Sequence, residues 1–218
     1  MKSSGTALDC PFGEGLGVSL QNNAPNNING TITGGTWKQT PQGTWYVDHD
    51  GADDYITFAD NEAWNLASGS CYFKIWFLCT VLPTDTRARI FSRYDGTNGF
   101  YISFETSGRL KFYWKNSGVD SIYILPVSVY NDGIWHQLIC SVDLPNTMAY
   151  IHVDKVEIGS YLMVAALADV ISDPLYIGGN NIIDSYRGGL TKPSIKTYFP
   201  TRANIDDLWE AERASFGR

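Results

Sequence analysis

The 218-residue sequence lacks a surplus of basic side chains. Lysine and arginine total 16 against 23 aspartate and glutamate residues, and the formal net charge at pH 7 is −7. Affinity for nucleic acids and anionic membranes depends largely on Lys and Arg side chains that neutralise phosphates. Neither nucleic acid nor a membrane surface is therefore an expected partner.

Long hydrophobic runs are also missing. No segment has the ~18 uninterrupted apolar residues of a membrane-spanning helix, so we expect no membrane insertion. The first residues, "MKSSGTALDCPFGEG", contain one early lysine and no apolar core, so they do not match a signal peptide. The cellular location stays unknown on this basis.

Cysteine is scarce and shows no metal-binding spacing. The four cysteines form no Cys-x-x-Cys motif, and Cys71 and Cys79 lie eight residues apart on one predicted strand, too far to bond each other. We expect all four to be reduced and a zinc site to be absent.

Aromatic residues and glycines are abundant, and together they favour strands and turns over helices. In "CYFKIWFLCTV" (71–81) every odd position is apolar, a period of two that marks a strand with one core face. "GFYISFETSGRLKFYWKNSG" (99–118) repeats this alternation as a hairpin. In the following "DSIYILPVS" (120–128) we expect Ile122 and Ile124 to face inward.

Helical signals are few. Residues 160–172 are ambiguous between a short helix and a packed loop, whereas Ile205, Leu208 and Trp209 recur at helical spacing and predict a C-terminal helix over about 203–215. No repeat or composition break divides the chain. We predict a single all-β domain over 1–218, a two-sheet antiparallel sandwich closed by a short C-terminal helix.

Six motifs, in this order, resemble the concanavalin A-like lectin/glucanase superfamily, and specifically its laminin G-like jelly rolls. They are "DGADDYITF" (50–58), "YFKIWFLCTV" (72–81), "IFSRYDGTNGFYISFETSGRLKF" (90–112), "DGIWHQLICSVD" (132–143), "MAYIHVDKVEIG" (148–159) and "PLYIGGN" (174–180). The resemblance implies a jelly roll, but relatives include lectins, adhesion modules, glucanases and lyases. The hairpin "VDKV" lacks the usual glycine, and "LTKPSIKTYFP" (190–200) lacks the acidic residues common on the closing strand.

Catalysis is not expected. His136 alternates with Ile134, Leu138, Cys140 and Val142, so it should point into the core and bond to backbone or a neighbouring strand. No strand carries the Glu-x-Asp-x-x-Glu pattern of the glucanases, and "WHQL" does not supply the lyase constellation. We therefore assign no catalytic residue.

Calcium is the one cofactor that the sequence suggests. Asp50, Asp53 and Asp54 in "HDGADD" offer carboxylate oxygens of the kind that calcium prefers, and laminin G-like relatives bind calcium at the sheet rim. The alternative is turn chemistry, because Asp-Gly pairs also favour tight turns.

A ligand face is predicted from the outward residues of the hairpin. Tyr101, Tyr113 and Tyr123 should form aromatic platforms, joined by Tyr72 and Trp76, with Asp95 and Asn98 as polar contacts; alternatively, a loop or another subunit covers this face.

The expected function is a non-catalytic module that binds a glycan or a protein surface. The alternative is a structural protein, such as a bacteriophage virion decoration or fibre component, in a larger assembly or homo-oligomer. Glucanase or lyase activity ranks third. On either of the first two readings, an extracellular or virion-associated location is expected.

Overall fold

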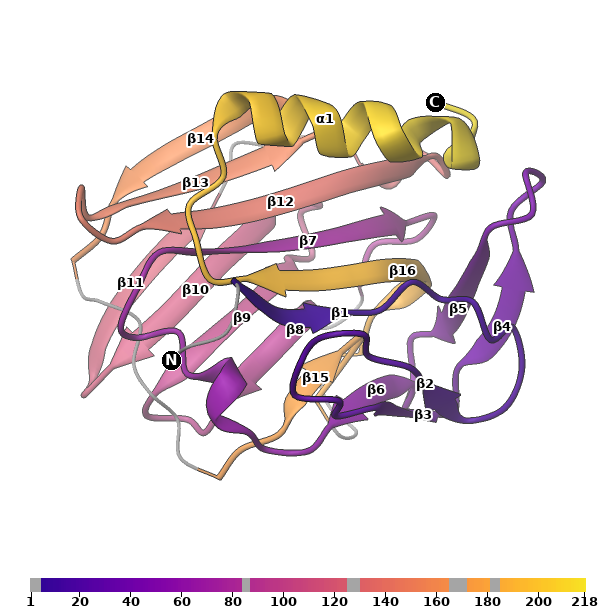
Figure 1. The fold of residues 1–218 in the computed structure, drawn as a ribbon, viewed down its shortest axis with the longest axis horizontal. Helices are drawn as coiled ribbons and strands as arrows, with labels where there is room; N and C mark the ends of the chain where they lie inside the picture. The colour runs from indigo at the N-terminus through magenta and orange to yellow at the C-terminus, as the bar shows by residue number, and fades with distance from the viewer. Residues whose placement is uncertain (1–4, 84–86, 125–129, 165–171, 181–184) are drawn as a thin grey trace.

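The computed structural model describes residues 5–83, 87–124, 130–164, 172–180 and 185–218, with the side chains of 122–124 left aside (Figure 1). Two eight-stranded antiparallel sheets pack face to face, which confirms the predicted all-β sandwich. Within the described residues, no helix is long and apolar enough to cross a membrane.

Sheet A has the strand order β14-β13-β12-β7-β16-β5-β4, with β1 paired to β16 beside this path. Its strands are β1 (Thr6–Asp9), β4 (Thr36–Gln39), β5 (Trp45–Asp50), β7 (Cys71–Leu78), β12 (Trp135–Asp143), β13 (Met148–Val153), β14 (Val156–Leu162) and β16 (Arg187–Lys196). Sheet B has the order β11-β10-β9-β8-β15-β6-β3-β2. Its strands are β2 (Ser19–Leu20), β3 (Gly30–Thr33), β6 (Tyr55–Phe58), β8 (Ala88–Tyr94), β9 (Gly99–Phe104), β10 (Leu110–Asn116), β11 (Val119–Ile124) and β15 (Leu175–Ile177).

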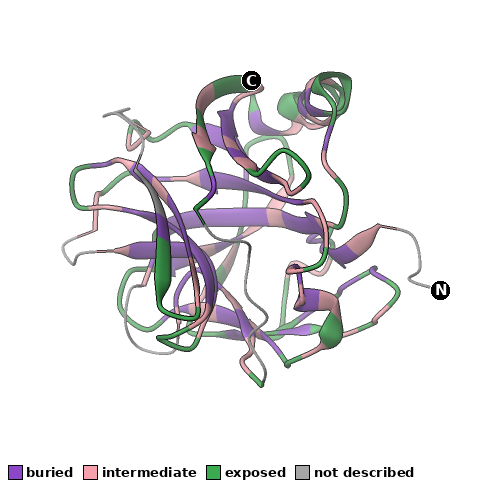
Figure 2. Cartoon of the chain, turned by 90° about the vertical axis from the view of Figure 1, so that its left-hand side faces the viewer, coloured by how far each residue is buried: buried purple, intermediate pink, exposed green. Residues whose placement is uncertain are grey.

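The core lies between the sheets and is rich in aromatic rings. The odd residues of β7 point into it, as the alternation predicts, and Phe73 packs against Phe91, Phe100 and Phe112 of sheet B. Figure 2 shows the strands buried through the centre of the molecule and the exposed residues mainly on loops and on the outer surface of the helix. The four cysteines are buried and free, as predicted.

The C-terminal helix covers the outer face of sheet A. Helix α1 (Arg202–Glu212) begins after a capping box formed by Thr201 and Asn204, and the 3₁₀ helix η2 (Arg213–Phe216) continues it, close to the predicted 203–215. Figure 1 shows α1 lying across the sheet beside β12 and β13. Its buried residues contact Tyr72, Trp76 and other even-numbered side chains of β7. These two aromatics are therefore covered and lie on sheet A, away from the predicted ligand face on sheet B.

One strand register and one element differ from the sequence expectation. The hairpin between β10 and β11 pairs Phe112 with Tyr123 and Tyr113 with Ile122, so Tyr123 occupies the Phe112 row and Ile122 the Tyr113 row. The two-residue turn at Ser117 and Gly118, both with positive φ, sets this register. The segment 160–172, predicted as a short helix or a packed loop, begins instead with the last three residues of β14, 160–162, and its residues 165–171 lie outside the described residues.

Candidate functional site

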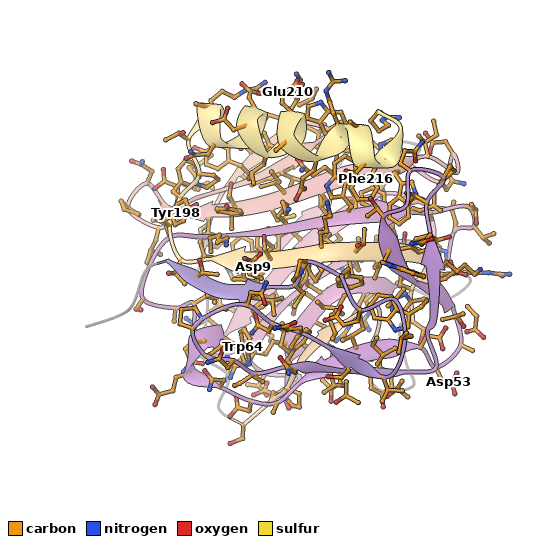
Figure 3. All side chains as sticks on the ribbon, turned by 45° about the vertical axis from the view of Figure 1, so that its right-hand side comes forward. Asp9, Asp53, Trp64, Tyr198, Glu210 and Phe216 are labelled. Carbon is orange, nitrogen blue, oxygen red and sulfur yellow. The ribbon has the colours of Figure 1, made fainter. Side chains whose placement is uncertain are left out.

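A groove beside the N-terminal strand has a volume of about 840 Å³. Its walls come from four parts of the chain: residues 5–7 at β1, residues 25–26, the segment 61–71 around the 3₁₀ helix η1 (Glu62–Trp64), and residues 197–198 between β16 and α1. Figure 3 shows Tyr198 and Trp64 on either side of the N-terminal strand. Tyr101, Tyr113, Asp95 and Asn98, the predicted ligand-binding residues whose side chains the structure describes, do not line this groove.

Helix η1 is held in place by its own polar and aromatic contacts. The Asn61 side chain accepts a hydrogen bond of 2.8 Å from the Ala63 backbone N–H and so caps the helix. Trp64 is fully buried against Phe58, and its indole N–H donates to the Ala59 carbonyl at 2.9 Å. The groove wall is therefore rigidly attached to sheet B.

Arg93 on β8 fastens the other end of η1. Its guanidinium donates to the Asn65 amide oxygen at 2.7 Å, contacts Asp60 at 2.7 Å and also donates to the Asp173 carbonyl at 3.1 Å. Arg93 is buried, and its guanidinium is held by these three contacts. The hydrogen bond from Arg93 therefore fixes the position of Asn65 in the groove wall.

Tyr198 forms the opposite wall and is 44% exposed. Its ring meets Tyr72 edge to face at 5.4 Å, and the two hydroxyl groups lie 3.4 Å apart. Gly5, at φ +38°, leaves room for this ring, because a Cβ there would stand 3.0 Å from the Tyr198 Cδ1. An exposed ring with one fixed edge is suited to contact with the apolar face of a ligand.

The lining offers amides, hydroxyl groups, one aromatic ring and one carboxylate, Glu62. A few convergent polar groups beside apolar surface are typical of small-ligand sites. Glycosidases of this fold use two neighbouring carboxylates, and the described lining contains only one. The groove is thus equipped to bind and lacks that catalytic pair.

Tyr101 and Tyr113, two of the three tyrosines predicted to form the ligand platform, are buried. Tyr101 and Tyr113 share the outer face of sheet B and stack at 4.5 Å, but they are only 2% and 6% exposed. The Arg89 guanidinium lies 4.7 Å from the Tyr101 ring, and the Tyr113 hydroxyl donates to Asp120 at 2.9 Å. The prediction that these two rings are open platforms is wrong; the side chain of Tyr123 lies outside the described residues.

Asp95 and Asn98 act in a turn. The Asp95 carboxylate accepts from the backbone N–H groups of Thr97 and Asn98 at 2.7 and 2.6 Å. The Asn98 amide oxygen accepts from the Ser117 N–H at 2.8 Å. The Asn98 bond connects the β8–β9 turn to the β10–β11 turn. Asp95 and Asn98 therefore have a structural role in stabilising these turns.

The structure brings Asp50, Asp53 and Asp54 together, with one carboxylate oxygen of each within 4.8 Å of the others. Turn chemistry is present too, since the Asp50 N–H donates to Asp54 and the Ala52 N–H donates to Asp50. Burial, and then the neighbouring carboxylates, raises the pKa of Asp54. The donor set suits a hard cation, which would relieve this repulsion.

His136 is buried, as predicted, but its partners are carboxylates. Its Nδ1 lies 2.7 Å from Asp154 and its Nε2 lies 3.2 Å from Asp132, and Arg218 also contacts Asp154 at 2.8 Å. The preceding Ile134 is 42% exposed and lies before β12, which corrects its predicted place in the core row. This cluster joins two turns to the C-terminal residues.

A family model described as the concanavalin A-like lectin/glucanases superfamily (Laminin_G_3) matches residues 50–205. No curated protein sequence matches the chain.

Solved structures similar to the chain include toxin binding domains. The binding domain of Paraclostridial Mosquitocidal Protein 1 superposes with a TM-score of 0.80 at 13% identity, covering 95% of this chain and 52% of that one. The binding domain of botulinum neurotoxin serotype D gives a TM-score of 0.75 at 11% identity, covering 95% and 52%. That of botulinum neurotoxin DC in complex with SialylT gives 0.75 at 13%, covering 95% and 51%.

The chain spans about half the length of these domains, and at such low identity the likeness shows the fold alone. The family match covers most of the chain and includes the segments that form η1 and the central strands of both sheets. The chain belongs to the concanavalin A-like lectin/glucanases superfamily.

Proposed function

We propose that the chain is a non-catalytic binding module that holds a glycan in the groove between β1, η1 and Tyr198. The observation that carries this proposal is the groove itself, with amides, hydroxyl groups and a carboxylate facing an exposed tyrosine. Hydroxyl-rich ligands match such polar groups, and the aromatic ring matches the apolar face of a pyranose.

The similar solved domains support a binding role. One botulinum neurotoxin DC binding domain was solved in complex with SialylT and another in complex with rat synaptotagmin II, and the present chain matches about half the length of each. For the present chain, a groove with polar lining favours a glycan over a flat protein surface.

The test is a glycan array followed by calorimetric titration of each oligosaccharide retained. We expect Tyr198→Ala to weaken binding about tenfold, since each factor of ten corresponds to ~1.4 kcal/mol, within the range of one aromatic contact. Tyr176→Ala is the matched control, because Tyr176 also makes one edge-on ring contact, at 5.9 Å to Tyr55, but does not line the groove. Absence of binding to every glycan, or an equal loss in both variants, would contradict the proposal.

The calcium site stays a prediction. If Asp50, Asp53 and Asp54 hold calcium, millimolar Ca²⁺ should raise the melting temperature and EDTA should return it to the metal-free value. Asp53→Asn should abolish this response, whereas Asp95→Asn, a carboxylate removed from another exposed turn, should leave it intact. An unchanged melting temperature across the calcium titration would exclude the site.

The alternative, a structural component of a larger assembly, predicts an obligate oligomer. Size-exclusion chromatography with light scattering separates the two proposals, because a binding module of this kind can be a 24.2 kDa monomer.

A further inference from the structure

The amide of Asn65 can present only donors to the groove. Its oxygen faces the Arg93 guanidinium at 2.7 Å, and a guanidinium has no acceptor, so the atom in that bond must be the oxygen. The Asn65 NH₂ group, which makes no hydrogen bond within the described part of the chain, is left for a ligand.

Asn61 is oriented by the same logic. Its amide oxygen accepts from the Ala63 backbone N–H at 2.8 Å, and a backbone N–H can only donate. The NH₂ group of Asn61, for which the described residues provide no hydrogen-bond partner, is the second donor in the same wall of the groove.

Glu62 places an acceptor beside these donors. In a 3₁₀ turn, side chains three residues apart lie over one another, so Glu62 and Asn65 share one side of η1, and the Asn65 N–H closes this turn on the Glu62 carbonyl at 3.0 Å. The Glu62 side chain is exposed and, among the described residues, has neither a hydrogen bond nor an ion pair. The geometry of this turn therefore places a carboxylate acceptor and an amide donor on the same side of η1.

The charges around the groove disfavour an anionic ligand. Glu62 is the only charged residue in the described lining. Two cations of the described residues that contact the groove walls are engaged: Lys196 donates to Thr6 at 3.2 Å and lies 3.8 Å from Asp9, and buried Arg93 contacts Asp60. The net charge of −7 on the whole chain also disfavours the approach of a carboxylate or sulfate.

We infer that the groove selects an uncharged saccharide, and that one sugar hydroxyl bridges the pair by accepting from the Asn65 NH₂ and donating to the Glu62 carboxylate. Asn61 supplies a second donor, and Tyr198 covers the ring. Arg93 is a positioning residue, because it forces the Asn65 amide to turn its donors outward. This inference rests on the proposed function and names the ligand class of the same site.

The test uses variants that exchange donor and acceptor without changing shape. A hydroxyl has one proton, so in Asn65→Asp it cannot donate to both carboxylates, and we expect affinity for the bound oligosaccharide to fall at least tenfold. Asn65→Asp keeps the acceptor that Arg93 requires, so the fold should persist. Glu62→Gln should weaken binding several-fold, because a charge-assisted bond becomes a neutral one.

The double variant Glu62→Gln with Asn65→Asp restores one donor and one acceptor and returns the net charge to that of the wild type. We expect it to bind at least threefold more tightly than Asn65→Asp alone, a recovery that a purely structural role of Asn65 would not produce. Asn98→Asp is the matched control; it makes the same change at a turn outside the groove and should leave affinity unchanged.

The probes are arrays of uncharged oligomers, namely cellohexaose, laminarihexaose and chitohexaose, beside sialyllactose and oligogalacturonate as anionic probes. Retention of one uncharged oligomer with the variant pattern above supports the inference. Tighter binding of an anionic probe, strengthened by Glu62→Gln and lost in Tyr198→Ala, would overturn the inference and leave the proposed function standing. Absence of binding to every probe would overturn both.

Discussion

At the scale of single residues, His49 on β5 carries a buried ring whose charged form the fold does not accommodate. The ring is 1% exposed, its Nδ1 lies 3.2 Å from the Val47 carbonyl, and Gly178 provides the space for its Nε2, since a Cβ there would approach to 2.3 Å. Burial lowers the pKa of His49 to about 4, although nearby carbonyls and carboxylates act in the opposite direction.

This shift predicts a loss of stability in mild acid. Above pH ~6.5 the ring is neutral in both the folded and the unfolded chain; as the pH falls towards 4, only the unfolded chain gains the proton. The free energy of unfolding should therefore drop by up to about 3 kcal/mol between pH 6.5 and 4 through this residue. Urea unfolding at several pH values measures the slope.

His49→Gln removes the titrating group and should flatten that slope relative to the wild type. His152→Gln is the control: burial also lowers the pKa of His152, but this ring lies under α1 and is not enclosed to the same degree. We expect a smaller flattening in that variant. A slope unchanged by His49→Gln would show that the ring does not set the acid response.

At the scale of elements, α1 and η2 are fixed to sheet A through a buried polar cluster and an aromatic stack. Glu212 contacts the Lys74 ammonium at 2.6 Å and accepts from the Trp76 indole at 2.7 Å and from Gln137 at 3.2 Å. Burial would raise the pKa of Glu212, but the adjacent Lys74 prevails and lowers it. Phe216 stacks on Trp76 with 4.0 Å between ring centroids.

We expect Phe216→Ala to lower the free energy of unfolding by about 3 kcal/mol, the usual cost of removing a buried aromatic ring. Guanidinium unfolding followed by tryptophan fluorescence measures this loss, since Trp76 and Trp209 both lie at the stack. Val119→Ala, at a half-exposed position on β11, is the control and should change stability by less than about 0.5 kcal/mol. Equal stability of both variants would mean that the helix is only loosely attached.

At the scale of the whole molecule, the two-sheet sandwich was predictable because its central strands alternate strictly. The odd residues of β7 point into the core, as the alternation predicts. The burial of Tyr72 and Trp76 under α1 and η2 could not be predicted from the sequence. The helical spacing of Ile205 and Trp209 predicts that one face of the helix is buried. No local sequence pattern indicates which face of which sheet this helix packs against.

Site prediction failed for two physical reasons. Alternation indicates the face on which Tyr101 and Tyr113 lie, but exposure depends on neighbours elsewhere in the chain, and these rings are buried. The second failure concerns the strand register. The two-residue turn "SG" (117–118) pairs Tyr123 with Phe112, and this pairing could have been predicted from the length of the turn. The groove joins residues near 6, 65 and 198, so no contiguous motif could indicate it.

The position of β16 has a consequence for how the chain is made. This strand follows all its partners in the sequence, sits between β7 and β5 and also pairs with β1, while β15 likewise enters between β8 and β6, which both precede it. Until residues 175–196 emerge, both nascent sheets have open gaps at their centres. We expect slow folding that cannot be completed before these residues are made, with unpaired strand edges exposed to aggregation during synthesis.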